Sequence, residues 1–142
     1  MVAELFVDTG AWLALQILDD RWHEQAAEAL RTGLARGYAL LTTNLVVGET
    51  YTYLRRAQGH EAAFRFIETL ERSPRLVQVH VDEELERQAF ALLRRYRDQA
   101  FSFVDGASFV VMHQRRIRRA LAFDAHFATA GFVRVPLDEP LA

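Results

Sequence analysis

The sequence predicts an α/β domain in which helices are layered around a short, mostly parallel sheet. Short apolar runs alternate with longer amphipathic segments along the whole chain, the pattern of strands joined by helices. The 142 residues suit one ordinary domain, and 51% hydrophobic residues supply material for its core. No repeat or linker interrupts the chain, which holds only 7 glycines and 3 prolines, so we expect a single domain over residues 1–142.

Strands are predicted where a short apolar run ends at a polar or turn-forming residue. The predicted strands cover residues 5–7, 38–41, 76–81, 120–123 and 132–135. In the third, Val77, Val79 and Val81 alternate with polar residues and therefore share one face. The last of the five is either a strand or an extended tail.

Helices are predicted where apolar residues recur at helical spacing between cap and stop residues. They cover residues 10–18, 20–36, 61–71, 82–98 and 102–115, with one more that ends at about residue 57 and a short one from residue 125. Asp20, Asp82 and Ser102 are placed to cap three of these helices. The helix that ends near residue 57 has three alternative caps, which are Thr42, Thr43 and Asn44.

The composition excludes several kinds of chemistry. Without cysteine there is no disulfide, thiolate zinc site or cysteine nucleophile, and without lysine there is no Schiff base or Walker A loop. All 17 basic residues are arginine, which reflects either genome composition or a use in bidentate phosphate contacts. The net charge of −2 argues against a uniformly basic nucleic-acid binder. Because we see no membrane-spanning apolar run and no signal peptide, we expect a cytoplasmic protein without a membrane partner.

Four acids are predicted to converge at one edge of the sheet. Asp8 and Asp124 follow predicted strands, while Glu49 and Asp105 lie in the first or second turn of predicted helices. All strands of a parallel sheet end at the same edge, so these side chains should share it. Taken singly, Asp8 and Asp124 are suitable helix caps, and Ser102 with Asp105 has the spacing of a capping box. The recurrence of an acid at most of these positions favours a common site.

The surroundings of Glu49 also bear on this hypothesis. Val46 and Tyr53 lie three and four residues from Glu49 and share its helix face. An acid beside apolar residues is expected to be partnered, protonated or bound to a cation. The alternative is a solvated residue at the edge of an amphipathic face.

The mutual repulsion of the four carboxylates predicts a bound cation. Two carboxylates about 4 Å apart repel by roughly 1 kcal/mol in water and by about 4 kcal/mol near a protein surface. Such a group should take up protons or a cation, and its oxygen ligands suit Mg²⁺ or Mn²⁺ rather than zinc. Metal-bound water is a nucleophile for phosphodiester hydrolysis. None of the 5 histidines has H-x-x-x-H spacing, and His126 either approaches the site or serves the surface or packing.

The residues around these acids resemble the PIN domain and, more narrowly, the VapC-type toxins of bacterial and archaeal toxin–antitoxin pairs. The resemblance extends from residue 5 to about residue 135 and is carried by Phe6-Val7-Asp8-Thr9, the helix around Glu49, Phe103-Val104-Asp105 and the stretch from Ala120 to Phe127, with Gly131-Phe132 after it. It implies a three-layer α/β/α sandwich and a metal-dependent endoribonuclease. It also implies an acidic site around Mg²⁺ or Mn²⁺ formed by Asp8, Glu49, Asp105 and Asp124, the last acting directly or through water. Thr9 would orient the first acid or hold a metal-bound water.

The same resemblance implies partners and products. An RNA substrate, a cognate antitoxin that covers the active-site groove and a second copy in a homodimer are expected, and cleavage should leave a 5′-phosphate and a 3′-hydroxyl. Gly106 departs from the family pattern, where a larger residue is common, and such a glycine costs up to about 1 kcal/mol relative to alanine. The arginines at 115–119 either bind RNA phosphates or are the charges of a helix C-terminus.

Two other functions fit parts of the sequence. A catalytically silent PIN-like module would pair with a partner protein in regulation, but the presence of all four acids argues against it. A phosphatase of the haloacid dehalogenase type also begins with an aspartate after a strand. Its D-x-D pattern fails at Gly10, and the absence of lysine counts against it as well.

Overall fold

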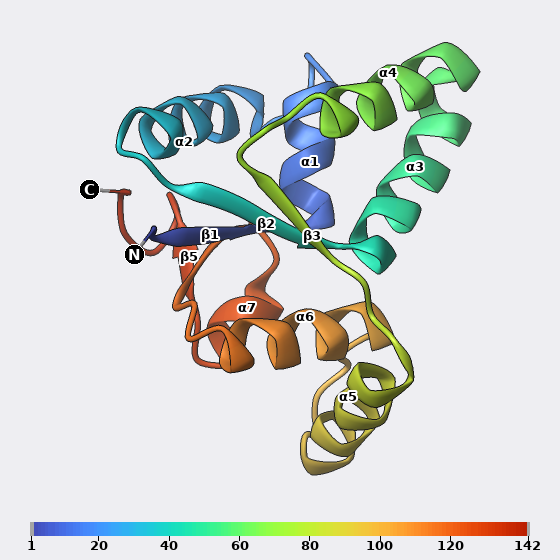
Figure 1. Cartoon of the computed structure of the whole chain (residues 1–142), viewed down its shortest axis with the longest axis vertical. Helices are drawn as coiled ribbons and strands as arrows, with labels where there is room; N and C mark the ends of the chain where they lie inside the picture. Colours follow the sequence, from blue (N-terminus) through green and yellow to red (C-terminus); the bar gives the residue numbers. More distant parts are fainter. Residues whose placement is uncertain (1, 142) are drawn as a thin grey trace.

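The central feature of the structure is a sheet of five parallel strands in the order β3-β2-β1-β4-β5 (Figure 1). The computed structural model describes residues 2–141, so residues 1 and 142 of the predicted domain lie outside the described residues. The strands are β1 (Glu4–Val7), β2 (Ala39–Thr43), β3 (Leu76–Val79), β4 (Arg119–Leu121) and β5 (Val133–Val135). The parallel sheet predicted from the sequence is confirmed.

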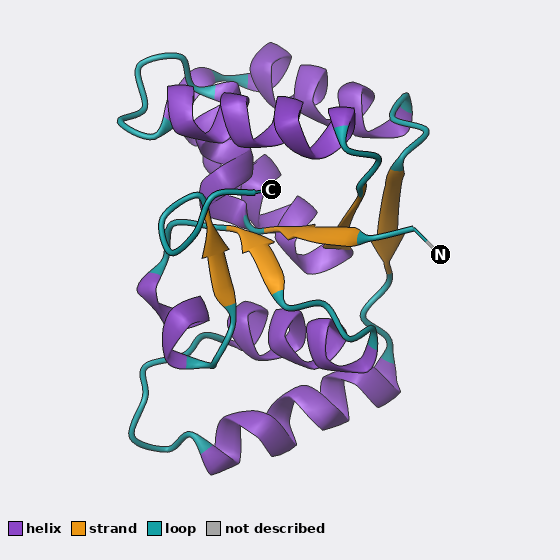
Figure 2. Ribbon diagram, turned by 90° about the vertical axis from the view of Figure 1, so that its left-hand side faces the viewer, coloured by secondary structure: helices purple, strands orange, loops and turns teal. Residues whose placement is uncertain are grey.

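Helices cover both faces of this sheet. The helices in the described chain are α1 (Thr9–Gln16), α2 (His23–Ala35), α3 (Asn44–Gln58), α4 (His60–Glu71), α5 (Glu83–Arg95), α6 (Phe103–Gln114) and α7 (Ala125–Thr129). Helices α1 to α4 lie on one side of the sheet and α5 to α7 on the other (Figure 1), and Figure 2 shows the sheet between two helical layers. The expected three-layer α/β/α sandwich is confirmed. Across residues 2–141, no helix combines the length and apolarity needed to cross a membrane.

The order of the strands reverses beside β1. From β1 the chain continues to β2 and β3 on one side, and it then crosses back to β4 and β5 on the other. The helices that follow β1 and β4 therefore lie on opposite faces, which opens a crevice at the carboxyl ends of these two strands. Asp8 follows β1 directly, and Asp124 lies in the segment after β4. The reversal brings two of the predicted acids to one crevice.

The side chains of β1 hold it at the centre of the core. Leu5, Phe6 and Val7 are fully buried, as expected for a strand covered by helices on both faces. The ring of Phe6 lies 6.2 Å from that of Phe127 in α7, and Phe127 meets Phe109 of α6 edge-on at 5.0 Å. These contacts fix the end of β1 relative to α6 and α7. Asp105 lies in the first turn of α6, and Asp124 immediately precedes α7.

The second helix begins later than predicted because Asp20 forms a turn rather than a helix cap. The side chain of Asp20 accepts a hydrogen bond from the backbone N–H of Trp22 at 2.8 Å, and α2 starts at His23. The predicted helix over 82–98 is also too long, since α5 ends at Arg95. Its predicted cap is correct, because Asp82 accepts the backbone N–H of Leu85 at 3.0 Å.

Polar side chains at the junction of β2 and α3 determine where α3 begins and where β3 ends. Thr43 is the cap of α3 among the three alternatives, since its hydroxyl accepts the backbone N–H of Val46 at 3.2 Å. The side chain of the next residue, Asn44, accepts the N–H of Val81 at 2.6 Å. β3 therefore ends at Val79, two residues before its predicted end, because Val81 is bonded to α3 instead of to β2.

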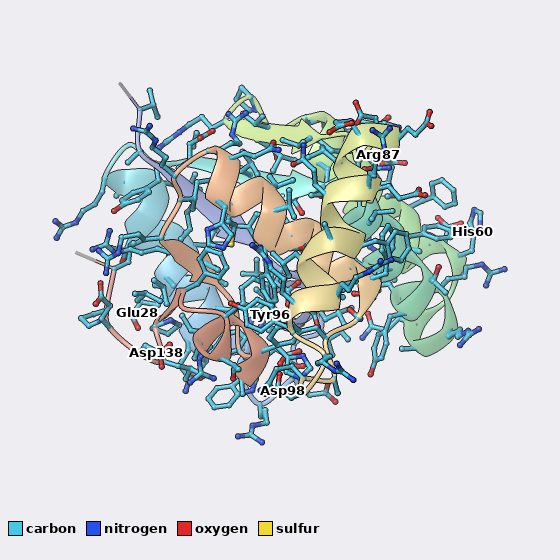
Figure 3. All side chains as sticks on the ribbon, turned by 90° about the horizontal axis from the view of Figure 1, so that it is seen from below. Glu28, His60, Arg87, Tyr96, Asp98 and Asp138 are labelled. Carbon is cyan, nitrogen blue, oxygen red and sulfur yellow. The ribbon has the colours of Figure 1, made fainter. Side chains whose placement is uncertain are left out.

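Helix α5 lies across α6, and Gly106 allows their close approach. Figure 3 shows α5 over α6, with Arg87 near its beginning and Tyr96 just past its end. A Cβ atom added at Gly106 would lie 2.8 Å from Cγ of Leu93 in α5, which is closer than real Cβ atoms approach other heavy atoms. Packing of α5 thus accounts for the glycine that departs from the family pattern.

Replacing Gly106 with alanine should destabilise the protein by about 1–2 kcal/mol, because overpacking against Leu93 outweighs the gain in helix propensity. Gly48 is the matched control, since it also lies inside a helix and an added Cβ there meets nothing within 4 Å. Gly48→Ala should instead stabilise by about 0.5–1 kcal/mol. Urea unfolding measures both changes, and equal stabilisation by the two variants would contradict the packing role of Gly106.

Candidate functional site

The four predicted acids lie at the carboxyl-terminal edge of the sheet, each at or near the start of a helix. Asp8 immediately precedes α1, and Asp124 immediately precedes α7. Asp105 lies in the first turn of α6, and Glu49 lies in the second turn of α3. The negative charges of Asp105, Glu49 and Asp124 all act on Asp8. We call these four residues the acidic site.

Asp8 is the most buried member of the acidic site, with 7% of its surface exposed. Asp8 occupies the N-cap position of α1, as the sequence suggested, but its side chain makes no capping hydrogen bond. Burial raises its pKa from the ordinary value of 3.8 to about 7, and the backbone N–H of Thr9 opposes this change. The charges of the other three acids are smaller contributions to the same rise in pKa. Its negative charge is therefore costly unless a proton or a cation compensates it.

Asp105 is held in place by two neighbours that bond to the same carboxylate oxygen. Its Oδ2 accepts the backbone N–H of Ser102 at 3.0 Å, while the hydroxyl of Ser102 accepts the N–H of Asp105 at 3.0 Å. The predicted capping box is thus formed. Nδ1–H of His126 donates to the same Oδ2 at 2.9 Å. No hydrogen bond from residues 2–141 reaches Oδ1, which leaves that oxygen for a ligand.

His126 joins Asp105 and Asp124 in a tight cluster. One ligand atom from each of these residues lies within 4.8 Å of the other two. Oδ1 of Asp124 accepts the backbone N–H of His126 at 2.8 Å, as expected of a cap residue. The imidazole also meets the ring of Phe101 edge-on at 5.1 Å, so His126 both approaches the site and serves packing. Asp8 and Glu49 stand outside this tighter group.

Thr9 connects the first helix to Glu49. Its hydroxyl donates a hydrogen bond to Oε1 of Glu49 at 2.5 Å, across 40 positions of sequence. Glu49 is exposed, yet this bond gives it the partner that its apolar neighbours in the sequence led us to expect. The hydroxyl thus bonds to Glu49, whereas the family resemblance implied that Thr9 orients Asp8 or holds a metal-bound water.

The arginine cluster at 115–119 lies away from the acidic site. Arg115 pairs with Glu4 at 2.7 Å, and Glu4 begins β1 at the amino-terminal edge of the sheet. Arg119 pairs with Glu139 at 3.1 Å. These ion pairs favour the structural interpretation of the cluster over contacts with RNA phosphates near the acids.

Comparison of the sequence with known proteins gives clear matches. The family model of the PIN domain matches residues 5–133. The chain is 41% identical over 132 residues to the 23S rRNA-specific endonuclease VapC20 of Mycobacterium tuberculosis, in both strain CDC 1551 / Oshkosh and strain ATCC 25618 / H37Rv. This match covers 92% of the chain and 97% of VapC20.

Comparison of the fold agrees with the sequence. The crystal structure of M. tuberculosis VapC20, a Sarcin-Ricin loop cleaving toxin, matches with a TM-score of 0.82 at 39% identity and covers 92% of this chain and 98% of that one. VapBC2 from Rickettsia felis, bound to a promoter DNA fragment, matches at 0.68 with 10% identity, covering 98% and 97%. FitAcB from Neisseria gonorrhoeae matches at 0.63 with 15% identity, covering 94% and 98%. The last two show likeness of fold alone.

The raised pKa of Asp8 predicts how the stability of the metal-free protein depends on pH. Folded Asp8 keeps its proton to about pH 7, whereas the unfolded residue loses it near its ordinary value of 3.8. Between these values the folded state binds more protons, so its stability should fall as pH rises, by about 4 kcal/mol in all. Asp8→Asn should remove this cost and be more stable than the wild type at alkaline pH.

Urea unfolding of both proteins from about pH 4 to pH 9, with a chelator present, measures the difference between their free energies of unfolding. Taking the difference cancels the contributions of groups that behave alike in the two proteins. A difference that stays constant across this range would contradict the buried, costly charge of Asp8.

Proposed function

The chain belongs to the PIN domain family and to its VapC-type members, and we propose that it is a metal-dependent endoribonuclease acting as the toxin of a toxin–antitoxin pair. The observation that carries the proposal is Asp8, a buried carboxylate with a raised pKa, surrounded by three further acids. The match to VapC20 supports it, because this chain covers 97% of that endonuclease. VapC20 cleaves the Sarcin-Ricin loop of 23S rRNA, which makes this loop the first substrate to test.

The residues present fit a divalent cation. The acidic site offers carboxylate oxygens, the donors preferred by Mg²⁺ and Mn²⁺. Asp8, Glu49, Asp105 and Asp124 would hold the ion. When bound, such an ion supplies an activated water and positive charge for the phosphate oxygens.

Other residues of this chain would position these ligands. Ser102 and His126 hold Oδ2 of Asp105, which leaves Oδ1 as the oxygen that would bind the ion. Thr9 fixes Oε1 of Glu49 and so limits the rotamers of an exposed side chain. Removing contacts of this kind to metal ligands typically lowers metal affinity or activity by about 10- to 100-fold.

A toxin of this kind needs a partner that restrains it. We propose a cognate antitoxin that covers the acidic site, and a homodimer as the form in which the chain acts. An RNA substrate and a chain without cysteine fit the cytoplasmic location expected from the sequence. The alternative of a catalytically silent module has no observation in its favour, since all four acids are present.

Single neutral substitutions in the acidic site test the activity. Asp8→Asn, Glu49→Gln, Asp105→Asn and Asp124→Asn should each lower Mn²⁺-dependent cleavage of a Sarcin-Ricin loop RNA, and Asp8→Asn by about 100-fold or more. The readout is the rate of appearance of RNA fragments with a 5′-phosphate.

The matched controls are Asp98→Asn, in the turn after α5, and Glu28→Gln on α2, both exposed and both labelled in Figure 3. These variants should cleave at the wild-type rate. Full activity of Asp8→Asn would overturn the assignment of the acidic site. Absence of cleavage by the wild-type protein on this loop and on total RNA would overturn the proposed function.

A further inference from the structure

A groove runs along α3 beside the acidic site. Its volume is about 520 Å³, within the range of roughly 300–1,000 Å³ typical of small-molecule sites. The lining residues include Gly48, Glu49, Tyr53, Arg56 and Val104. All but Val104 belong to α3, and Val104 belongs to the first turn of α6. We call this the α3 groove.

The α3 groove is continuous with the acidic site. Its lining includes Glu49 of α3, a member of that site, and Val104 of α6, the neighbour of Asp105. A linear substrate bound across the acidic site could therefore continue along the protein surface into the groove. The groove is open at Gly48, where an added Cβ would meet nothing within 4 Å.

Two side chains give the α3 groove a recognisable chemistry. Tyr53 is 53% exposed, and its ring makes no aromatic contact with another described side chain, unlike Tyr51, which packs on Phe64 at 5.5 Å. Arg56 is exposed and has no ion-pair partner within residues 2–141. The two lie three residues apart on the same helix face. The groove thus offers an unstacked aromatic ring and an unpaired cation side by side.

We propose that the α3 groove holds an unpaired nucleotide next to the cleaved phosphodiester, with its base on Tyr53 and a phosphate on Arg56. This inference rests on the proposed ribonuclease function. Charge complementarity favours RNA as the ligand, because the unpaired guanidinium of Arg56 suits a phosphate. The exposed ring selects an unpaired base, because bases of loops and single strands stack on aromatic side chains while duplex bases stack on each other.

The spacing along α3 assigns Arg56 to a neighbouring phosphate rather than the cleaved one. Arg56 follows Glu49 by seven residues, which is about 10 Å along the helix axis at 1.5 Å per residue. The cleaved phosphate must lie at the acids, so Arg56, about two turns farther along α3, is placed for the phosphate of a neighbouring nucleotide. Tyr53, between the two, faces the space where the intervening nucleotide would lie.

The test measures binding of RNA that cannot be cleaved. All proteins carry Asp8→Asn, and the probe is a fluorescein-labelled single-stranded RNA of mixed sequence, about ten nucleotides long. Adding Tyr53→Ala should weaken binding about five- to tenfold, while Tyr53→Phe, which keeps the ring, should bind like the parent. A duplex of the same sequence should bind the Tyr53→Ala protein and its parent equally.

The contribution of Arg56 is read from the salt dependence of binding. Arg56→Ala should reduce the slope of log Kd against log salt concentration by about one, the loss of one phosphate contact. The matched control is Arg65→Ala on α4, another exposed arginine without an ion-pair partner in the described chain, which should leave the slope unchanged. An unchanged slope for Arg56→Ala would overturn the phosphate contact.

Two further measurements separate the inference from the function on which it rests. Light scattering follows the oligomeric state, and a shift in that state by Tyr53→Ala with unchanged RNA affinity would make the groove an interface between copies and overturn the proposal. Cleavage of the same RNA is measured with Asp8 intact. Cleavage by the wild type together with equal RNA affinity of the parent and the Tyr53→Ala variant would refute the subsite while the ribonuclease function stands.

Discussion

The cost of an ionised Asp8 at the buried end of the central strand is the constraint on which the rest of the site depends. Burial disfavours its charge, and three further acids at the same edge disfavour it more. A strand that ends in such a residue stays in place only if its other side chains stabilise it by packing. Here β1 is fixed by fully buried Leu5, Phe6 and Val7, whose packing outweighs the cost at the strand end. The fold thus holds the carboxylate where a cation would relieve it.

Two of the other acids are oriented by hydrogen bonds, two of which come from residues distant in the sequence. Asp105 is held by the backbone of Ser102 and by the imidazole of His126, and Glu49 is held by the hydroxyl of Thr9. Each contact occupies one carboxylate oxygen and leaves the other. The site therefore combines two buried carboxylates, Asp8 and Asp105, with hydrogen bonds that orient Asp105 and Glu49, an arrangement suited to a small, hard cation.

The sequence was informative about the fold because the relevant signals are local. Apolar runs and their stops located all five strands, and a parallel sheet then required Asp8 and Asp124 to share an edge. Side-chain contacts between distant segments carry no such signal. The bond from Thr9 to Glu49 joins residues 40 apart, and the bond from His126 to Asp105 joins residues 21 apart. The role of Gly106 likewise depends on Leu93, a residue of another helix.

We infer that a divalent cation replaces the proton on Asp8, and calorimetric titration with Mn²⁺ measures this exchange. At about pH 6, below the folded pKa of Asp8, binding should release close to one proton, measured by comparing buffers of different ionisation enthalpy. Release should fade as pH rises above the pKa of Asp8 and be absent in Asp8→Asn. Failure of Mn²⁺ to bind, or binding with the same proton release in wild type and Asp8→Asn, would contradict the account.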